Sequence, residues 1–469
     1  MALTIANNVT SLNAQTNLGK ASSALATSVE RLSSGLKINR GADGPAALVI
    51  SEKQRAQIAG LKQAIDNSNK AVSLVQTAEG ALGEINALLV KVRSLALDSA
   101  NAAVNDDDAL AANQAEINNA LDTINRISSN TQFGTKKLLD GSAGTRGTAS
   151  DADVTFLKGT TDTVTGSYAV AVTTVGERAN VTAGTGQTGP LATAETLTVN
   201  GVAIQLDAGF SQSQVVDRIN EFTDQTGVIA DVDGGDLRLY TEEFGSAATI
   251  SVQSNVAAAA TSSGVGVAAL TDTGVDIIGT IDGVTITGVG NVLKSATGDT
   301  KGIEIRLAAD ADPVETVTGA QGTVDIVNDS LIFQIGPNQN QTAQISINKV
   351  DAASLGMNLT GNQFANLAAI DVTSASKAQD AIGVIDQAIN DVTNLRGELG
   401  AFQQNTLSST ANNLRTTLEN TTNAESVIRD TDFAAEIAEF TKNQVLVQAG
   451  TSILANANQI PQQILSLLR

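Results

Sequence analysis

The chain has 469 residues, of which 28 are basic and 49 acidic, and its formal net charge of −21 argues against sequence-independent binding to nucleic acid or to an anionic membrane. It contains no histidine and no cysteine, which excludes disulfides, thiolate nucleophiles, Ser-His-Asp triads and zinc sites with His or Cys ligands. We therefore expect neither an enzyme nor a bound metal ion or cofactor. Because aromatic residues make up only 3% of the chain, a core must be built from Ala, Val, Ile and Leu, which suits long helical packing.

The amino-terminal segment 1–20 has no basic start, no continuous apolar run and no A-x-A cleavage site, so a cleaved signal peptide is not predicted. No stretch reaches about 18 apolar residues, so no membrane span is predicted either. We expect the protein to stay in the cytoplasm or to leave by a route that needs no cleaved signal.

Residues 1 to about 140 have the composition and the periodicity of helices. Leu18, Leu25 and Leu32 lie seven residues apart, and Val29 and Leu36 complete a stripe with steps of three and four residues. This stripe predicts an amphipathic helix that ends before the glycine-rich breaker at 41–45.

A long helix is predicted from about 46 to 100, with Pro45 in its first turn, where a missing N–H costs nothing. Its apolar stripe consists of Ile58, Leu61, Ile65, Val72, Val75, Leu82, Ile85, Leu89 and Val92. Residues 105–108 predict a turn whose Asp or Asn side chains cap another helix. That helix carries Leu110, Gln114, Ile117, Leu121 and Ile124 at heptad spacing.

The middle of the chain, residues 141–370, is rich in Gly, Thr, Val and Asp and reads as β structure. It carries 9 basic and 25 acidic residues, a net charge of −16, so most of the acidity is predicted to face solvent here. Alternating residues predict two short strands within 197–204, and further strands within 285–308 and 322–348. Residues 211–226 predict one short amphipathic helix, with Val215, Ile219 and Phe222 on one face.

Residues 229–241 predict a hairpin that bends at Gly234 and Gly235. The acidic residues from Asp231 onward also imitate a calcium-binding loop. The glycine that such a loop needs at its sixth position is replaced here by Asp236, so we favour the hairpin turn.

The last part of the chain, from about 375 to 469, returns to helical composition. Its apolar residues recur at seven-residue spacing or in steps of three and four: Ile385, Val392 and Leu399; Leu395 and Phe402; and Phe433, Ile437, Phe440, Val447 and Leu454. A helix with such a stripe requires a partner, because an isolated stripe stays exposed to water. We expect the two helical ends to pair into a long coiled-coil hairpin with the β-rich middle inserted between them, an α+β fold.

The extreme ends are the most informative part of the sequence. Residues 2–19 and 443–468 contain no charged residue, although both are rich in Asn, Gln, Ser and Thr. An uncharged striped helix is poorly soluble alone and is best buried among copies of itself. A terminal helix docked on its own domain is the alternative interpretation.

Several ordered motifs at both ends resemble the bacterial flagellin family. At the amino-terminal end these are IANNVTSLNAQTNL at 5–18, ERLSSGLKIN at 30–39, AVSLVQTAEGAL at 71–82 and TQFGTKKLL at 131–139. At the carboxyl-terminal end they are LRGELGAFQQN at 395–405, NAESVIRDTDFA at 423–434 and ANQIPQQILSLLR at 457–469. Together the matching regions cover about half of the chain.

The resemblance implies a nested arrangement of five segments. Residues 1–44 and 431–469 would form the amino- and carboxyl-terminal parts of an inner helical core. Residues 45–140 and 371–430 would form a surrounding helical shell, and residues 141–370 a variable β-rich outer region. Within that region, 197–252 resembles a β-α-β insertion found in flagellins and hook-associated proteins.

The resemblance also implies a function and partners. The chain would be a structural subunit that polymerises with itself into the extracellular flagellar filament, after type III flagellar export. Its other partners would be the export apparatus, a flagellin export chaperone, and the hook-associated junction and cap proteins. The residues expected to form the assembly seam are Leu18, Leu25, Leu32, Phe433, Ile437, Phe440, Val447 and Leu454.

A surface resembling the one that a host Toll-like receptor recognises on flagellins is expected at Lys91, Arg93, Leu95 and Glu116. The family pattern has arginine at the position of Lys91, and lysine cannot reproduce the planar two-pronged hydrogen bonding of arginine. Packing between subunits is the alternative role of these residues. Two other functions stay open for the whole chain: a hook–filament junction protein and a secreted coiled-coil adhesin.

Overall fold

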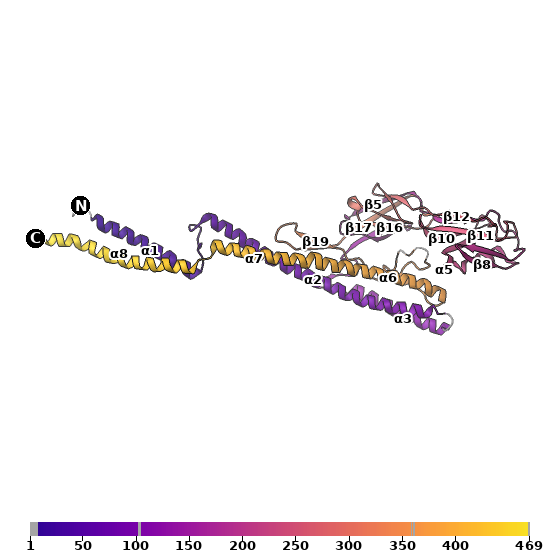
Figure 1. Cartoon of the computed structure of the whole chain (residues 1–469), viewed down its shortest axis with the longest axis horizontal. Helices are drawn as coiled ribbons and strands as arrows, with labels where there is room; N and C mark the ends of the chain where they lie inside the picture. The colour runs from indigo at the N-terminus through magenta and orange to yellow at the C-terminus, as the bar shows by residue number, and fades with distance from the viewer. Residues whose placement is uncertain (1–7, 102–104, 358, 360–361, 468–469) are drawn as a thin grey trace. The chain divides into compact units, whose positions relative to one another are not determined.

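The computed structural model describes residues 8–101, 105–357, 359 and 362–467 (Figure 1). Helices at both ends of the chain flank a β-rich middle, which confirms the predicted α+β class. The chain forms two compact units: unit 1 contains residues 1–69, 334–342 and 408–469, and unit 2 contains residues 70–333 and 343–407. The predicted division into five segments stays a prediction, and the ends of its two core segments, 1–7 and 468–469, lie outside the described residues.

The helices follow the predicted order. They are α1 Val9–Ser34, α2 Pro45–Ser99, α3 Asp107–Asn130, α4 Gln212–Asn220, α5 Thr223–Thr226, α6 Ala375–Ala401, the π-helix η3 Phe402–Ser408, α7 Ser409–Arg429 and α8 Phe433–Leu467, with short 3-10 turns η1 Gly298–Thr300 and η2 Leu367–Ala369. Pro45 opens α2, as predicted. The Asp106 side chain caps α3 by accepting the Ala109 N–H at 2.9 Å, which confirms the predicted cap.

The strands are short and lie between α3 and α6. They are β1 Gln132–Phe133, β2 Lys136–Lys137, β3 Thr145–Ala149, β4 Val154–Lys158, β5 Gly166–Thr174, β6 Arg178–Thr182, β7 Glu195–Val199, β8 Val202–Leu206, β9 Val228–Asp233, β10 Asp236–Phe244, β11 Thr249–Ser254, β12 Leu270–Thr273, β13 Ile278–Ile281, β14 Val284–Thr287, β15 Val292–Lys294, β16 Glu304–Leu307, β17 Gly319–Asn328, β18 Leu331–Gln334 and β19 Thr342–Ile345.

The helical part of unit 2 combines α3, α6 and the 70–99 stretch of α2. The predicted stripe of α2 is largely buried here, with Leu82, Ile85, Leu89 and Val92 each 0% exposed. Gln114 of α3, the polar member of its predicted stripe, binds the segment that enters α6: it accepts the Val372 N–H at 2.6 Å. Thus the polar residue at this heptad position forms a hydrogen bond with a backbone segment rather than with a second helix.

Asp391 of α6 holds another backbone segment. Its carboxylate accepts the Gly356 N–H at 3.1 Å and a hydrogen bond from Gln387 at 2.9 Å. Burial raises the pKa of this carboxyl group above its ordinary value, more than these hydrogen bonds lower it.

Unit 2 also contains two β cores. In the first, a five-stranded sheet of order β14-β13-β5-β17-β3 and a three-stranded sheet of order β15-β16-β4 share one apolar cluster, which includes Val170, Leu293 and Ile305. In the second, the sheets β12-β11-β7-β8 and β6-β10-β9 share a cluster with α4, whose Val215 and Ile219 are fully buried.

The second β core also contains a buried carboxylate. Glu195 is 1% exposed and accepts the Ser263 N–H at 2.9 Å and the Ser254 hydroxyl at 2.5 Å. These bonds tie the end of β11 and the segment after it to strand β7.

The predicted hairpin is confirmed as β9 and β10, with Gly234 and Gly235 at positive φ in the bend. The carboxylates of Asp231 and Asp233 pair with Arg238 at 2.6 and 3.4 Å, so the hairpin uses them within the chain. This arrangement agrees with a turn rather than a calcium loop.

The single helix predicted over 211–226 is wrong in its length. The structure has α4 and then a separate short α5, because the chain tightens at Phe222, whose N–H bonds to Ile219 only three residues back. Phe222 still packs against the second β core, as expected for the apolar face. The π-helix between α6 and α7 has no counterpart among the predicted elements.

No helix in the described part of the chain is long and apolar enough to cross a membrane.

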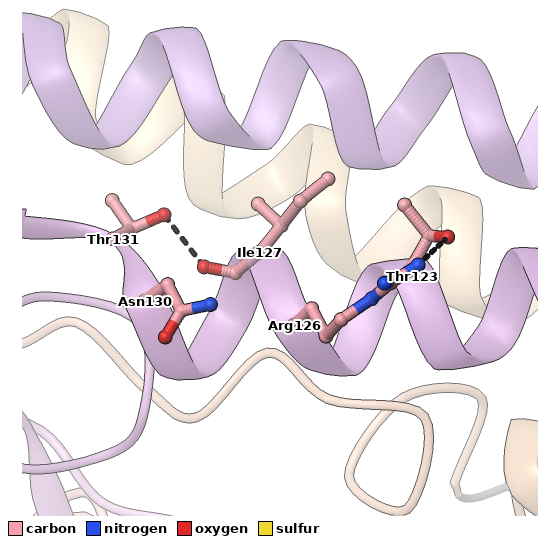
Figure 2. A pocket seen from close by; sticks show the side chains of 5 residues that line it. All are labelled: Thr123, Arg126, Ile127, Asn130 and Thr131. Atoms are coloured by element: carbon pink, nitrogen blue, oxygen red, sulfur yellow. Dashed lines mark hydrogen bonds between the residues drawn. The ribbon is translucent and has the colours of Figure 1, made fainter.

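At the carboxyl-terminal end of α3, a hollow of about 340 Å³ is lined by Thr123, Arg126, Ile127, Asn130 and Thr131 (Figure 2). Arg126 donates to the Thr123 hydroxyl at 3.1 Å, and the Thr131 hydroxyl donates to the Ile127 carbonyl at 2.6 Å. These polar groups bond along their own helix and do not converge on a common point.

Candidate functional site

The two chain ends form an antiparallel helix pair, α1 and α8, within unit 1 (Figure 1). At one end of the pair, the Asn8 side chain donates to the Ala457 carbonyl at 2.9 Å, and the Ser11 hydroxyl donates to Asn458 at 2.7 Å. At the other end, Arg31 and Glu436 lie 3.5 Å apart. The expected pairing of the helical ends is therefore present within a single chain.

Each helix contributes one buried or half-buried stripe to this pair, and we call the two stripes together the pair seam. The seam consists of Ser11, Ala14, Leu18, Ala21, Leu25, Ser28 and Leu32 of α1, and of Glu436, Phe440, Asn443, Val447, Gly450, Leu454 and Ala457 of α8. All steps are of three or four residues, as in a coiled coil. Contact is close at Gly450, where an added Cβ would lie 3.2 Å from Leu18 Cδ1.

Six of the eight residues expected to form the assembly seam lie on the pair seam. Phe433 and Ile437 do not, since each is 52% exposed. Glu436 occupies the seam position beside Ile437 and pairs with Arg31. Phe433 lies against Gly35, which follows the last residue of α1 and has no side chain to cover the ring.

The pair leaves a large apolar surface uncovered by its own chain. The side chains concerned are Val9 (58% exposed), Leu12 (60%), Val29 (48%), Phe433 and Ile437 (52% each), Val445 (58%), Leu446 (47%) and Ile453 (58%). Val29 was expected on the buried stripe, and that expectation is wrong, because Ser28 takes the seam position. Exposed apolar groups of this extent are typical of a protein–protein contact surface.

Backbone hydrogen bonds fix the junction at which α1 and α7 end. The Lys37 N–H donates to the Arg429 carbonyl at 2.7 Å, and the Thr431 N–H donates to the Gly35 carbonyl at 3.0 Å. Asp43 accepts two backbone N–H groups from the same loop, and these bonds lower the pKa of its carboxyl group. The sequence stripes carry no signal for this junction, because backbone bonds leave no side-chain pattern.

The candidate receptor surface is a set of ion pairs that join three helices of unit 2. Lys91 of α2 pairs with Glu116 of α3 at 2.5 Å. Arg93 of α2 forms two hydrogen bonds with Asp386 of α6, at 2.6 and 3.2 Å, and these bonds raise the pKa of the guanidinium group. Leu95 is half-buried.

Sequence reasoning missed Asp386. The residue follows Ile385, which belongs to the buried stripe of α6, so the sequence pattern alone places Asp386 at the edge of that stripe. Its pairing with Arg93 depends on the angle at which α6 meets α2. These charged residues thus join helices within one chain, and their alternative role in packing between subunits stays a prediction.

Acidic residues do not gather into a metal site in the described part of the chain: no group of three or more Asp or Glu side chains has the arrangement to hold an ion.

Comparisons with known proteins agree at both ends and along the full length. The family model of the bacterial flagellin N-terminal helical region matches residues 5–144, and that of the bacterial flagellin C-terminal helical region matches residues 382–468. The chain is 35% identical to the B-type flagellin of Pseudomonas aeruginosa, over 100% of both chains. It is 33% identical to a flagellin of Clostridium tyrobutyricum, over 98% of this chain and 100% of the relative.

Among solved structures, the chain is similar to that of FliC from Burkholderia pseudomallei. The similarity covers 71% of this chain and 99% of that chain, with 18% identity and a TM-score of 0.25. At this score the likeness carries no argument about function.

Proposed function

The chain belongs to the bacterial flagellin family, and from this premise we propose how its two ends serve the flagellar filament. It is a structural subunit of that filament. The hook–filament junction protein and the adhesin are not favoured, because flagellins match the chain over its whole length. Since the family is structural, no catalytic role is proposed.

The observation that carries the proposal is the contrast between the chain ends and the middle. The α1–α8 pair satisfies its own seam and still exposes eight large apolar side chains among its described residues, while residues 2–19 and 443–468 carry no charge. The middle, by contrast, carries a net charge of −16. Copies of an acidic chain can pack closely only where charge is absent, so the pair lies inside the polymer and the middle outside.

Apolar burial supplies the free energy of this packing. Fully burying a Val, Leu, Ile or Phe side chain contributes about 1.5–3 kcal/mol. Leu446 and Ile453 lie seven residues apart on the outer side of α8, at 47% and 58% exposure. Their burial against neighbouring copies stabilises the polymer without disturbing the pair seam.

Removal of residues 443–469 tests the proposal. The truncated protein should lose polymerisation, judged by electron microscopy after a precipitating salt is added, and should keep the circular dichroism of its β cores. A finer test replaces Leu446 or Ile453 with alanine, with Gln448→Ala as the matched control because Gln448 is exposed and polar. Normal filaments from the truncated chain contradict the proposal.

Delivery and partners complete the proposal. The chain leaves the cell through the flagellar type III export apparatus with the help of an export chaperone, and meets the hook-associated junction and cap proteins at the filament ends. Its lack of cysteine suits passage as an unfolded chain. Export that continues in a strain lacking the flagellar export apparatus would oppose this route.

A host Toll-like receptor is a further proposed partner of the surface at Lys91, Arg93, Leu95 and Glu116. The ion pairs of Lys91 and Arg93 compete with such a partner for the same charged groups. A receptor reporter cell line exposed to purified monomer should respond weakly, and more strongly to Lys91→Arg. An equal response to both proteins would show that the lysine makes no difference.

A further inference from the structure

A cleft of about 880 Å³ lies within unit 2, and we call it the α6 cleft. Helix α6 lines one side of it, and strands β3 and β4 and the segment 344–350 line the rest. Small-molecule sites in proteins have volumes of roughly 300–1,000 Å³, so the cleft is large enough for a ligand.

Two carboxylates of α6 line the cleft, those of Asp391 and Glu398. They are seven residues apart, which is close to two turns, so both lie on the same face of α6 and about 10.5 Å apart along its axis. Asn394 and Leu395 line the cleft between them and carry no charge. This wall therefore presents two acidic groups separated by an uncharged stretch.

The basic side chains of the cleft have other partners. Each of the three pairs with a carboxylate that does not belong to α6: Arg146 with Asp329 at 2.5 Å, Lys349 with Asp351 at 2.5 Å, and Lys158 with Glu304 at 3.8 Å. Among the described residues, neither Asp391 nor Glu398 forms an ion pair with a lysine or arginine. The two α6 carboxylates are thus left without a cation of their own.

Asn348 adds an acceptor that lacks a donor. Its Oδ1 atom is buried, and it accepts no hydrogen bond from the described part of the chain. Asn348 also lines the cleft. A buried acceptor without a donor is unfavourable, and a ligand that brings an N–H group removes this cost. The cleft therefore lacks positive charge and hydrogen-bond donors, and an ammonium group supplies both.

We propose that the α6 cleft binds a linear diamine or polyamine, with one ammonium group at Asp391, another at Glu398, and the methylene chain along Leu395 between them. Asn348 accepts a further hydrogen bond from the ligand. The net charge of −16 in the middle of the chain attracts such a cation toward the cleft. This site is independent of the filament contacts made by the α1–α8 pair.

Lys158 of β4 opposes the ligand, because its positive charge acts on Asp391. Replacing it separates a cationic ligand from an anionic one. Lys158→Gln should strengthen diamine binding, since a repulsive charge is removed. Weaker diamine binding by this variant would contradict the assignment of a cationic ligand.

Isothermal titration of the full-length monomer tests the site with two diamines of equal charge. Octamethylenediamine is long enough to reach both carboxylates, whereas tetramethylenediamine (putrescine) reaches only one at a time. The longer diamine should bind about tenfold more tightly or better, because the shorter one loses a charge-assisted hydrogen bond. Octanediol, which has the same length without charge, should not bind. Equal affinity for the two diamines, or no binding of either, overturns the proposal.

Glutamine variants locate the site on α6. Glu398→Gln should weaken binding of octamethylenediamine about tenfold, because one ammonium group loses its carboxylate partner. Glu84→Gln is the matched control, since Glu84 is equally exposed on a helix of unit 2 and does not line the cleft. It should bind as the wild type does. An equal loss in both variants would show that the ligand is attracted only by the overall negative charge.

Discussion

Deleting one residue from the π-helix should leave the protein as stable as before, whereas deleting one from α7 should not. Gln404 is exposed, and its removal shortens the step from Leu399 to Leu407 from eight residues to seven. A regular α-helix then places Leu407 in line with the buried stripe of α6 without a π turn. We expect the free energy of unfolding to change by less than about 1 kcal/mol, since no apolar contact is lost.

Deleting exposed Asn412 has two possible structural outcomes, and both are costly. Either the π-helix persists and the half-buried Leu414, Leu418 and Ile428 turn outward, or it converts to α-helix and fully buried Leu407 turns outward. At about 1.5–3 kcal/mol for a fully buried side chain and half of that for a half-buried one, the first outcome costs roughly 2–4.5 kcal/mol and the second roughly 1.5–3 kcal/mol.

Denaturant unfolding followed by the helical circular dichroism signal compares the two deletions. Amide hydrogen exchange over 402–408 adds a local measurement, because four-residue backbone bonds replace the π pattern when Gln404 is removed. Equal destabilisation by the two deletions would refute the view that the π-helix accommodates one extra residue between Leu399 and Leu407.

Three further predictions concern unit 2. Glu195→Gln should destabilise the second β core by about 1.5–3 kcal/mol in denaturant unfolding, because a charged acceptor of the Ser263 N–H is lost; no change would contradict this role. The pKa of Asp391 is raised in the folded protein, so ionising its carboxyl group costs more in the folded than in the unfolded state. The free energy of unfolding therefore falls as pH rises from the ordinary pKa of 3.8 through the folded pKa. The advantage of Asp391→Asn should grow over that window and stay flat above it, and an advantage that shrinks would contradict the sign. Gly264→Ala should cost more than about 3 kcal/mol, because φ is +79° and the new Cβ would lie 1.9 Å from a carbonyl oxygen, whereas Gly283→Ala, at φ +74° in open space, should cost only about 1 kcal/mol.

Much of the helical architecture follows from local rules. Pro45 starts α2 and Asp106 caps α3, because the needs of a helix start are met by single residues. The hairpin at Gly234 and Gly235 forms because both residues adopt positive φ, which glycine permits without strain. Such features depend on neighbours in the sequence and can be predicted from them.

The missed features depend on distant contacts. Phe433 and Ile437 fit a three-four stripe as well as their neighbours do, but the stripe does not say where α1 ends, and Gly35 leaves Phe433 uncovered. Asp386 pairs with Arg93 across 293 residues of sequence. Neither relation has a local signature.

The sequence by itself determined that the chain has helical ends without charge, an acidic β-rich middle and no means for His or Cys chemistry, because composition and periodicity carry this information directly. Only the tertiary structure decided which side of each helix is buried. The step from Leu399 to Leu407 is visible in the sequence as two leucines eight residues apart, yet its meaning depends on a π turn. Whether a stripe is buried depends on the partner that covers it as well as on the stripe itself. The faces that remain for contact with other copies are therefore known only once the faces buried within one chain have been identified.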